Sequence, residues 1–161
     1  MNKFKNIEEI YELLGKTTSL IPIKEGAKLP SIKTWKNLTL DDTFKADYQA
    51  KLEKSTNIGV LQGTRSNNLC SIDIDSDELM GDFVENNPAF ANTLITKGKR
   101  GANYWFRPIG LSPKLIKEDW GEVRGEGCYT LIKGMHPDDI EYSILNFNDP
   151  IRIEFDKIKL P

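Results

Sequence analysis

The sequence predicts a mixed α/β (α+β) domain in which a largely antiparallel sheet is flanked by helices. Several short stretches alternate apolar and polar residues, which is typical of strands that bury one face. Between them lie segments whose apolar residues are three and four positions apart, the spacing of an amphipathic helix. No Gly/Ser-rich linker divides the chain, so we expect residues 1–161 to form a single domain.

The N-terminal part predicts two helices and an intervening strand. Residues 4–15 have helical apolar spacing and end at a glycine, as amphipathic helices often do. Residues 20–23 predict a short strand whose proline favours a sheet edge. A turn-rich stretch follows, and a second helix is expected over residues 39–52 with Thr39 or Asp41 as its N-cap.

The rest of the chain predicts a third helix among strands. Residues 57–63 and 68–75 are expected as two strands of a hairpin, because a short polar turn joins them. A helix over residues 76–86 begins at Ser-Asp-Glu and ends before a proline. Residues 121–127 are interpreted as a bent, glycine-rich segment. Further strands are expected over residues 93–96, 102–107, 128–132, 140–147 and 151–155.

The composition excludes several classes of protein. No apolar stretch approaches membrane-spanning length and the N-terminus has no signal-peptide core, so we expect a soluble, cytoplasmic protein without a membrane partner. A net charge of −2 does not by itself indicate nucleic-acid binding. Cys70 and Cys128 lie in apolar contexts and are expected as reduced core thiols. With one histidine, His136, they also argue against structural zinc.

The strand over residues 68–75 carries the first candidate site. Asp73 and Asp75 are two positions apart, so both side chains share the face opposite Cys70, Ile72 and Ile74. Two carboxylates held roughly 6–7 Å apart repel each other unless a cation lies near them. Hard oxygen donors suit Mg²⁺ or Mn²⁺, as in phosphoryl-transfer and nucleotidyl-transfer enzymes. The alternative is that both aspartates are solvated at an exposed strand end.

A basic turn follows in the chain. Lys97, Lys99 and Arg100 have no acid among them, and the neighbouring glycines let backbone N–H groups approach a ligand closely. The turn therefore predicts a bound anion, with a solvated hairpin turn as the alternative. If Asn103 shares the face of Asp73, its amide can bind a phosphate or a sugar. The alternative for Asn103 is a polar residue at a strand edge.

Two further positions remain open. Glu122 and Arg124 alternate and can project to one face, where Glu122 completes a metal shell or forms only a surface ion pair with Arg124. His136 lies in a Met-His-Pro turn and is interpreted as a structural residue rather than a catalyst.

Together, these segments resemble the N-terminal primase–polymerase (Prim-Pol) domain of the archaeo-eukaryotic primase superfamily, found in plasmid, phage and prophage replication proteins. The resemblance covers about Leu20 to Tyr142, with the motifs in the family's order. These motifs are Ile21-Pro22-Ile23 with Lys28-Leu29-Pro30 and Trp35; Asn57 to Gly63 with Ile72-Asp73-Ile74-Asp75; Thr96 with Gly98 to Phe106; Glu122 to Tyr129; and His136-Pro137 with Tyr142.

The resemblance implies a sheet like that of the RNA-recognition motif (RRM-like), with an added N-terminal α/β unit. It also implies template-directed nucleotidyl transfer, that of a DNA primase and DNA polymerase. Asp73, Asp75 and Glu122 would be the catalytic acids that hold two Mg²⁺ or Mn²⁺ ions. The implied partners are a DNA template and primer, a dNTP or NTP, and a helicase domain or protein.

The chain departs from the family at Asn103, which stands where the family has a histidine that contacts the incoming nucleotide. Asparagine carries no charge, so phosphate binding should weaken by about 1–3 kcal/mol. Lys97, Lys99, Arg100 and Arg124 are expected to bind the nucleotide beside it. Trp105 or Tyr104 stacks a base or belongs to the core. The alternatives to a polymerase are therefore a catalytically weakened nucleotide- or nucleic-acid-binding domain of the same fold, and less readily a metal-dependent nuclease.

Overall fold

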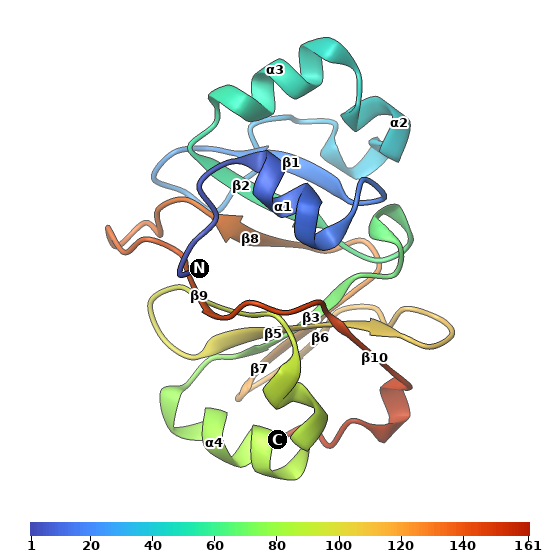
Figure 1. The fold of residues 1–161 in the computed structure, drawn as a ribbon, viewed down its shortest axis with the longest axis vertical. Coiled ribbons are helices and arrows are strands. Elements are labelled where there is room, and N and C mark those ends of the chain that lie inside the picture. Colours follow the sequence, from blue (N-terminus) through green and yellow to red (C-terminus); the bar gives the residue numbers. More distant parts are fainter.

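Two β-sheets organise the chain in the computed structural model, which describes residues 1–161 (Figure 1). The smaller sheet is antiparallel and has the strand order β1-β2-β8. Its strands are β1 (Ser19–Ile23), β2 (Asn57–Leu61) and β8 (Tyr129–Lys133). Pro22 lies in β1, an edge strand, as predicted.

The larger sheet has seven strands in the order β6-β7-β3-β5-β4-β9, and β10 pairs with β5. Every pairing is antiparallel except that of β10 with β5. The strands are β3 (Cys70–Ile74), β4 (Ile95–Lys97), β5 (Ala102–Pro108), β6 (Ile116–Glu118), β7 (Gly121–Arg124), β9 (Ser143–Asn146) and β10 (Ile151–Ile153). The predicted fold class, a largely antiparallel α/β architecture with an added N-terminal unit, is confirmed.

Three helices belong to the N-terminal unit: α1 (Ile7–Leu14), α2 (Leu40–Thr43) and α3 (Ala46–Lys54). Thr39 caps α2, and its side chain and that of Asp42 exchange hydrogen bonds with each other's backbone N–H groups. The single helix predicted over residues 39–52 is wrong, because the chain breaks between α2 and α3. The Gln49 amide donates to the Thr43 carbonyl and so satisfies the end of α2.

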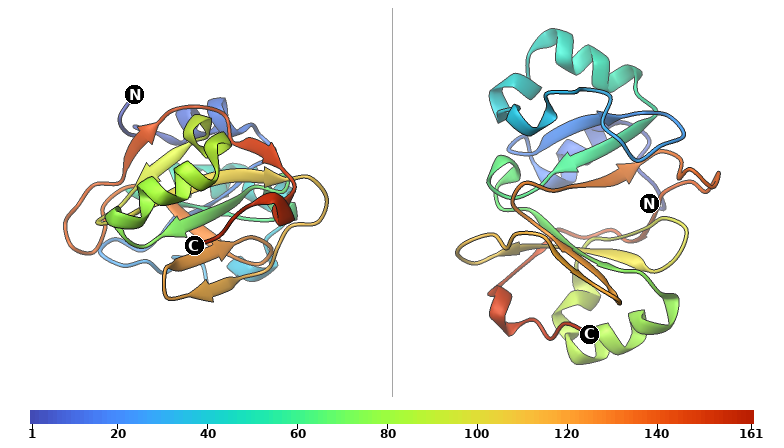
Figure 2. Two further views of the ribbon diagram at one scale, coloured as in Figure 1. Left: turned by 90° about the horizontal axis from the view of Figure 1, so that it is seen from below. Right: turned by 180° about the vertical axis from the view of Figure 1, so that it is seen from behind.

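A shared apolar core joins the two sheets. It contains buried side chains from α1, α3 and the three-stranded sheet, together with Leu69, Leu94, Trp105 and Ile144 from the side of the seven-stranded sheet. Trp105 is fully buried there, and its indole N–H donates to Thr96 Oγ1 at 2.9 Å. Figure 2 shows the two sheets as successive layers of one body.

The opposite face of the seven-stranded sheet is covered by α4 (Asp77–Asn86). The side chains of Ile72 and Ile74 in β3, and of Tyr104 in β5, pack there against Phe83 of α4 and Phe90 of the 3₁₀ turn that follows it. The alternation predicted for β3 and β5 therefore holds, with apolar residues toward α4 and Asp73 and Asn103 toward the three-stranded sheet.

The hairpin predicted for residues 57–75 is wrong. Gly63 and Leu69 form one isolated bridge around a turn that contains the left-handed residues Asn67 and Asn68. Beyond it the strands diverge, because β2 pairs with β1 and β8 whereas β3 pairs with β5 and β7. The Arg107 guanidinium donates to backbone carbonyls of this turn and supports it between the sheets.

Other differences from the prediction are local. The glycine-rich residues 121–127 begin as a strand, β7, before they bend, and β6 beside it was not predicted. Both cysteines are free thiols, Cys70 buried and Cys128 half-buried. None of the helices has the length and apolar character needed to cross a bilayer.

Candidate active site

A row of polar side chains crosses the middle of the seven-stranded sheet. Glu122 of β7 pairs with Asp73 of β3, Asp73 pairs with Asn103 of β5, and Asn103 pairs with Thr96 of β4. Directly paired residues of neighbouring strands point to the same face of a sheet. The register therefore brings Glu122, Asp73 and Asn103 together, although they lie far apart in the sequence.

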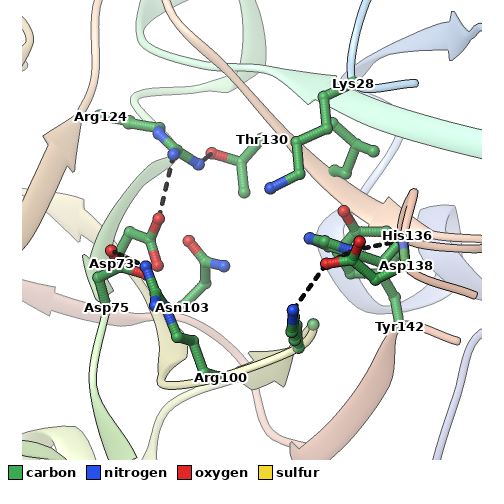
Figure 3. A pocket seen from close by; sticks show the side chains of 13 residues that line it. Lys28, Asp73, Asp75, Arg100, Asn103, Arg124, Thr130, His136, Asp138 and Tyr142 are labelled. Atoms are coloured by element: carbon green, nitrogen blue, oxygen red, sulfur yellow. Dashed lines mark hydrogen bonds and ion pairs between the residues drawn. The ribbon is translucent and has the colours of Figure 1, made fainter. Parts of the chain in front are cut away.

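Asp73 and Asn103 of this row line a cavity of about 290 Å³ between the two sheets (Figure 3), whereas Glu122 is not among the residues that line it. The seven-stranded sheet and the turn after β4 contribute Asp73, Asp75, Gly98, Lys99, Arg100, Asn103 and Arg124. The three-stranded sheet and its loops contribute Lys28, Thr130, Leu131, His136, Asp138 and Tyr142. The lining is therefore strongly polar, with acids and cations facing one another.

Arg124 binds two of the acids. Its Nη2 lies 3.0 Å from Asp73 Oδ2 and its Nε 2.7 Å from Glu122 Oε2. Burial raises the pKa of Asp73, and the nearby carboxylates of Asp75 and Glu122 add to the rise while Arg124 opposes it. Burial alone would lower the pKa of Arg124, but Asp73 and Glu122 outweigh it and hold that pKa above its ordinary value.

Asp75 and Arg100 form a second pair at the cavity rim. Arg100 Nε and Nη2 each donate to one carboxylate oxygen of Asp75 at 3.0 Å, a bidentate geometry. The Arg100 side chain is about two-thirds exposed and that of Asp75 about half exposed, so this pair can open at small cost. Lys97 lies elsewhere: its ammonium group pairs with Asp77, and it does not line the cavity.

Asn103 carries an unsatisfied oxygen. Its Oδ1 is buried and has no hydrogen-bond partner, which makes it the one such side-chain atom in the chain. A buried acceptor without a donor is costly unless a ligand supplies what is missing. Because Asn103 lines the cavity, this atom indicates that the site is built to receive a donor or a cation.

The opposite wall is built by the turn between β8 and β9. His136 Nδ1 accepts a hydrogen bond from the Asp138 N–H at 3.0 Å. Burial and the nearby Lys28 lower the pKa of His136, so the ring is neutral at physiological pH. Lys99 Nζ and Asp138 Oδ2 lie 3.0 Å apart, and this ion pair connects the basic turn to this wall.

Sequence reasoning missed part of this wall. The sequence patterns did not indicate Lys28, Thr130, Asp138 or Tyr142 as site residues. They favoured a structural role for His136, which lines the cavity with them. Lys28, His136 and Tyr142 fall within motifs of the family resemblance, which was the available signal. Of the two alternatives for Trp105 and Tyr104, base stacking or a place in the core, the structure supports the core, because both rings are fully buried.

The arrangement of the acids can be compared with the set of ligands that a divalent cation requires. As the side chains lie, no three acidic, histidine or cysteine groups converge into a metal-binding cluster, since arginines occupy the carboxylates. The donors are nevertheless hard oxygens that Mg²⁺ and Mn²⁺ prefer. Asp73 and Asp75 line the cavity, and Glu122 pairs directly with Asp73 in the sheet. The unpaired Asn103 Oδ1 adds another oxygen beside Asp73. The residues present thus fit such a cation once the arginines release them.

The sequence matches the model of a known protein family. The model of the Prim-Pol family, described as the N-terminal domain of bifunctional DNA primase/polymerase, matches residues 11–153. That range contains every residue that lines the cavity. No curated protein sequence matches the chain.

Proposed function

Since the chain belongs to the Prim-Pol family of bifunctional DNA primase/polymerase N-terminal domains, we propose that its cavity catalyses template-directed nucleotidyl transfer from a dNTP or NTP to a primer strand. The observation that carries the proposal is the row formed by Glu122, Asp73 and Asn103, of which Asp73 and Asn103 line one cavity together with several cations. A nucleoside triphosphate with its divalent ions carries both kinds of charge that such a cavity would complement.

In this proposal the acids and the cations have separate tasks. Asp73, Asp75 and Glu122 would hold Mg²⁺ or Mn²⁺, which would lower the pKa of the primer 3′-hydroxyl and neutralise the leaving pyrophosphate. Lys99 and Arg100 bind phosphate oxygens, and Lys28 does so from the facing wall.

Arg124 and Asn103 complete the site. Arg124 is a positioning residue that keeps the carboxylates of Asp73 and Glu122 on one side of the cavity until the cation arrives. Asn103 would donate its amide N–H to the triphosphate, and its free Oδ1 would accept a hydrogen bond from the substrate or supply an oxygen ligand. Lys97 is assigned a supporting role, since its pairing with Asp77 fixes the start of the basic turn.

A primer-extension assay tests the proposal. The protein is incubated with a labelled primer on a template, dNTPs and Mn²⁺ or Mg²⁺, and extension is expected. Asp73→Asn should abolish extension, whereas Asp82→Asn, an exposed aspartate on α4, should leave it unchanged. Full extension by Asp73→Asn would reject the assignment of the acids, and primer shortening would indicate a nuclease instead.

A second function is favoured by one observation. Each of the three acids is already paired with an arginine, as in a site that binds a ligand without performing chemistry. A binding domain of this kind would retain nucleotide in a titration but extend no primer with either metal. The same two measurements therefore separate the polymerase from the binder.

A further inference from the structure

An exposed basic segment lies beside the cavity and, apart from Lys28, takes no part in the site described above. Residues 24–36, here called the basic loop, connect β1 to the 3₁₀ turn at Trp35 and run over the surface (Figure 2). The loop carries four lysines and a single acid, Glu25. The lysines are Lys24, Lys28, Lys33 and Lys36, and all four are exposed.

None of these lysines forms an ion pair or a side-chain hydrogen bond, whereas most acids around the cavity are paired. Four unpaired positive charges within thirteen residues create a local field that the net charge of −2 conceals. Such a surface attracts a polyanion, and its charges need no rearrangement to bind one.

The backbone of the basic loop is held from the protein side. The Tyr129 hydroxyl donates to the Lys28 carbonyl at 2.7 Å, and Arg65 Nη1 donates to the carbonyls of Trp35 and Lys36 at 2.9 and 3.2 Å. These bonds fix the backbone, while the four lysine side chains remain exposed and unpaired. The loop is therefore preorganised, which lowers the entropic cost of binding.

An aromatic side chain lies among the charges. Trp35 is half-buried, and its ring packs edge-on against Tyr129 with a centroid distance of 5.0 Å. Lys36 Nζ lies 5.7 Å from the centroid of the Trp35 ring. Leu29, which is 60% exposed, adds apolar surface to the same loop. Unpaired cations interleaved with an accessible aromatic ring are typical of surfaces that bind single-stranded nucleic acid.

The basic loop is continuous with the cavity. Lys28 belongs to both, and Figure 3 shows its ammonium group pointing into the cavity, opposite the acids. A strand that lies along the loop is thus led to the row that contains Asp73. We infer that the basic loop is the docking surface for single-stranded DNA, with Trp35 stacking a base and the lysines contacting successive phosphates.

This inference relies on the proposed function only for the identity of the strand as the template, because binding can be measured without catalysis. The experiment titrates the full chain into a fluorescein-labelled oligothymidylate of about 16 nucleotides and follows anisotropy at several salt concentrations, without metal or nucleotide. The variants are Lys33→Gln/Lys36→Gln and Trp35→Leu. The matched control is Lys51→Gln/Lys54→Gln on α3, which removes the same charge elsewhere.

We expect the Lys33→Gln/Lys36→Gln variant to reduce the slope of log K against log salt by about 1.4, at about 0.7 for each lost phosphate contact. The control should keep the wild-type slope. Trp35→Leu should weaken binding roughly fivefold or more at every salt concentration, because a stacking contact is lost rather than a charge. Thermal unfolding of each variant verifies folding, and the lysine variant tests the inference even if Trp35→Leu proves unstable.

Several outcomes would overturn the inference. These are no binding by the wild-type chain, an unchanged slope in Lys33→Gln/Lys36→Gln, or an equal loss in the control, which would mean that net charge alone binds DNA. Primer extension combined with an unchanged slope would reject the docking surface and leave the proposed function standing. If the lysine variant reduces the salt slope but the wild-type protein extends no primer, the proposed function is rejected and the docking surface is supported.

Discussion

Asp73 and Glu122 face each other across β3 and β7, and the single guanidinium group of Arg124 binds both carboxylates. This arrangement keeps two like charges together in a partly buried place. It also means that the acids are stabilised by a protein cation when no metal ion is bound. The first prediction tests that relationship.

Arg124→Met should lower the free energy of unfolding by about 3 kcal/mol, because it leaves two partly buried carboxylates without their partner. Mn²⁺ should then raise the melting temperature of the variant more than that of the wild type, since a cation can replace the guanidinium. The control Arg152→Met removes an exposed arginine from β10 and should change neither quantity. Melting curves with Mn²⁺ and with EDTA provide the test, and equal shifts in both proteins would contradict it.

The raised pKa of Asp73 predicts a dependence of stability on pH. Because burial places this pKa above the ordinary aspartate value of 3.8, the folded state binds the proton more tightly than the unfolded chain does. The ionised carboxylate therefore lowers the free energy of unfolding at neutral pH, and this cost disappears as the pH falls through the folded-state pKa toward 3.8.

Asp73→Asn should accordingly unfold at higher urea concentration than the wild type at neutral pH, with Glu122 still paired to Arg124. The difference should shrink as the pH is lowered through the range just above 3.8. Urea titrations at a series of pH values measure it, with Asp82→Asn as a control whose difference stays flat. If the stability advantage of Asp73→Asn over the wild type grew as the pH was lowered, burial would not be destabilising the ionised Asp73.

Gly121 and Gly101 allow close backbone contacts on both sides of β3. Gly121 has φ +143° and Gly101 φ +60°, and a Cβ at either position would overlap a carbonyl oxygen of β3, that of Asp73 or that of Ile74. Gly121→Ala should cost about 3 kcal/mol and reduce activity, because Asp73 must move. Gly81→Ala in α4 meets open space and should gain about 0.5–1 kcal/mol. Chemical denaturation of the two variants gives the comparison, and similar stabilities would refute it.

The ion pair between Lys99 and Asp138 predicts an effect on affinity alone. Both side chains are about half exposed, so Asp138→Asn should leave the melting temperature unchanged. It frees Lys99 and removes a negative charge from the cavity, so a triphosphate should bind roughly twofold to fivefold tighter. Calorimetric titration with dATP and Mg²⁺ measures this, and the exposed Asp119→Asn is the control. Weaker binding would show that Asp138 holds the wall in place for the ligand.

Asn103 predicts a gain of function. Asn103→His places an imidazole beside Asp73, which favours its protonated, positively charged form. The KM for the incoming dNTP should fall about tenfold, because a charge-assisted hydrogen bond replaces a neutral one. Asn103→Asp reverses the charge and should raise KM. Steady-state primer-extension kinetics of each variant measure these KM values. A higher KM for Asn103→His would mean that the cavity requires asparagine at this position.

The sequence was sufficient for features that depend on neighbouring residues. Alternation placed Asp73 opposite Ile72 and Ile74, and it separated Asn103 from Tyr104, because side chains of a strand alternate whatever the strand pairs with. Alternation left Glu122 as either a third acid or an ion-pair partner of Arg124, and the resemblance favoured the third acid. The register of β3 and β7 places Glu122 beside Asp73, and Glu122 also forms the ion pair with Arg124.

Features that depend on pairing between distant segments were beyond local patterns. The turn after β2 has the residues of a hairpin, yet β3 joins the other sheet, since both edges of β2 are taken by β1 and β8. The three residues of β6 are too few to show a period. Lys28 and His136 reach the cavity only because their loops project from the smaller sheet, which no spacing in the sequence reveals.

The order of the strands along the chain prevents the two sheets from being separated into independent fragments. β1 and β2 come first, the chain then builds five strands of the other sheet, and only afterwards does β8 return to lie beside β2. Ile132 of β8 packs in the same core as Val60 of β2. A gene cut after Leu61 would therefore leave β1 and β2 without β8, the third strand of their sheet. The two sheets are consequently not modules that recombination could exchange.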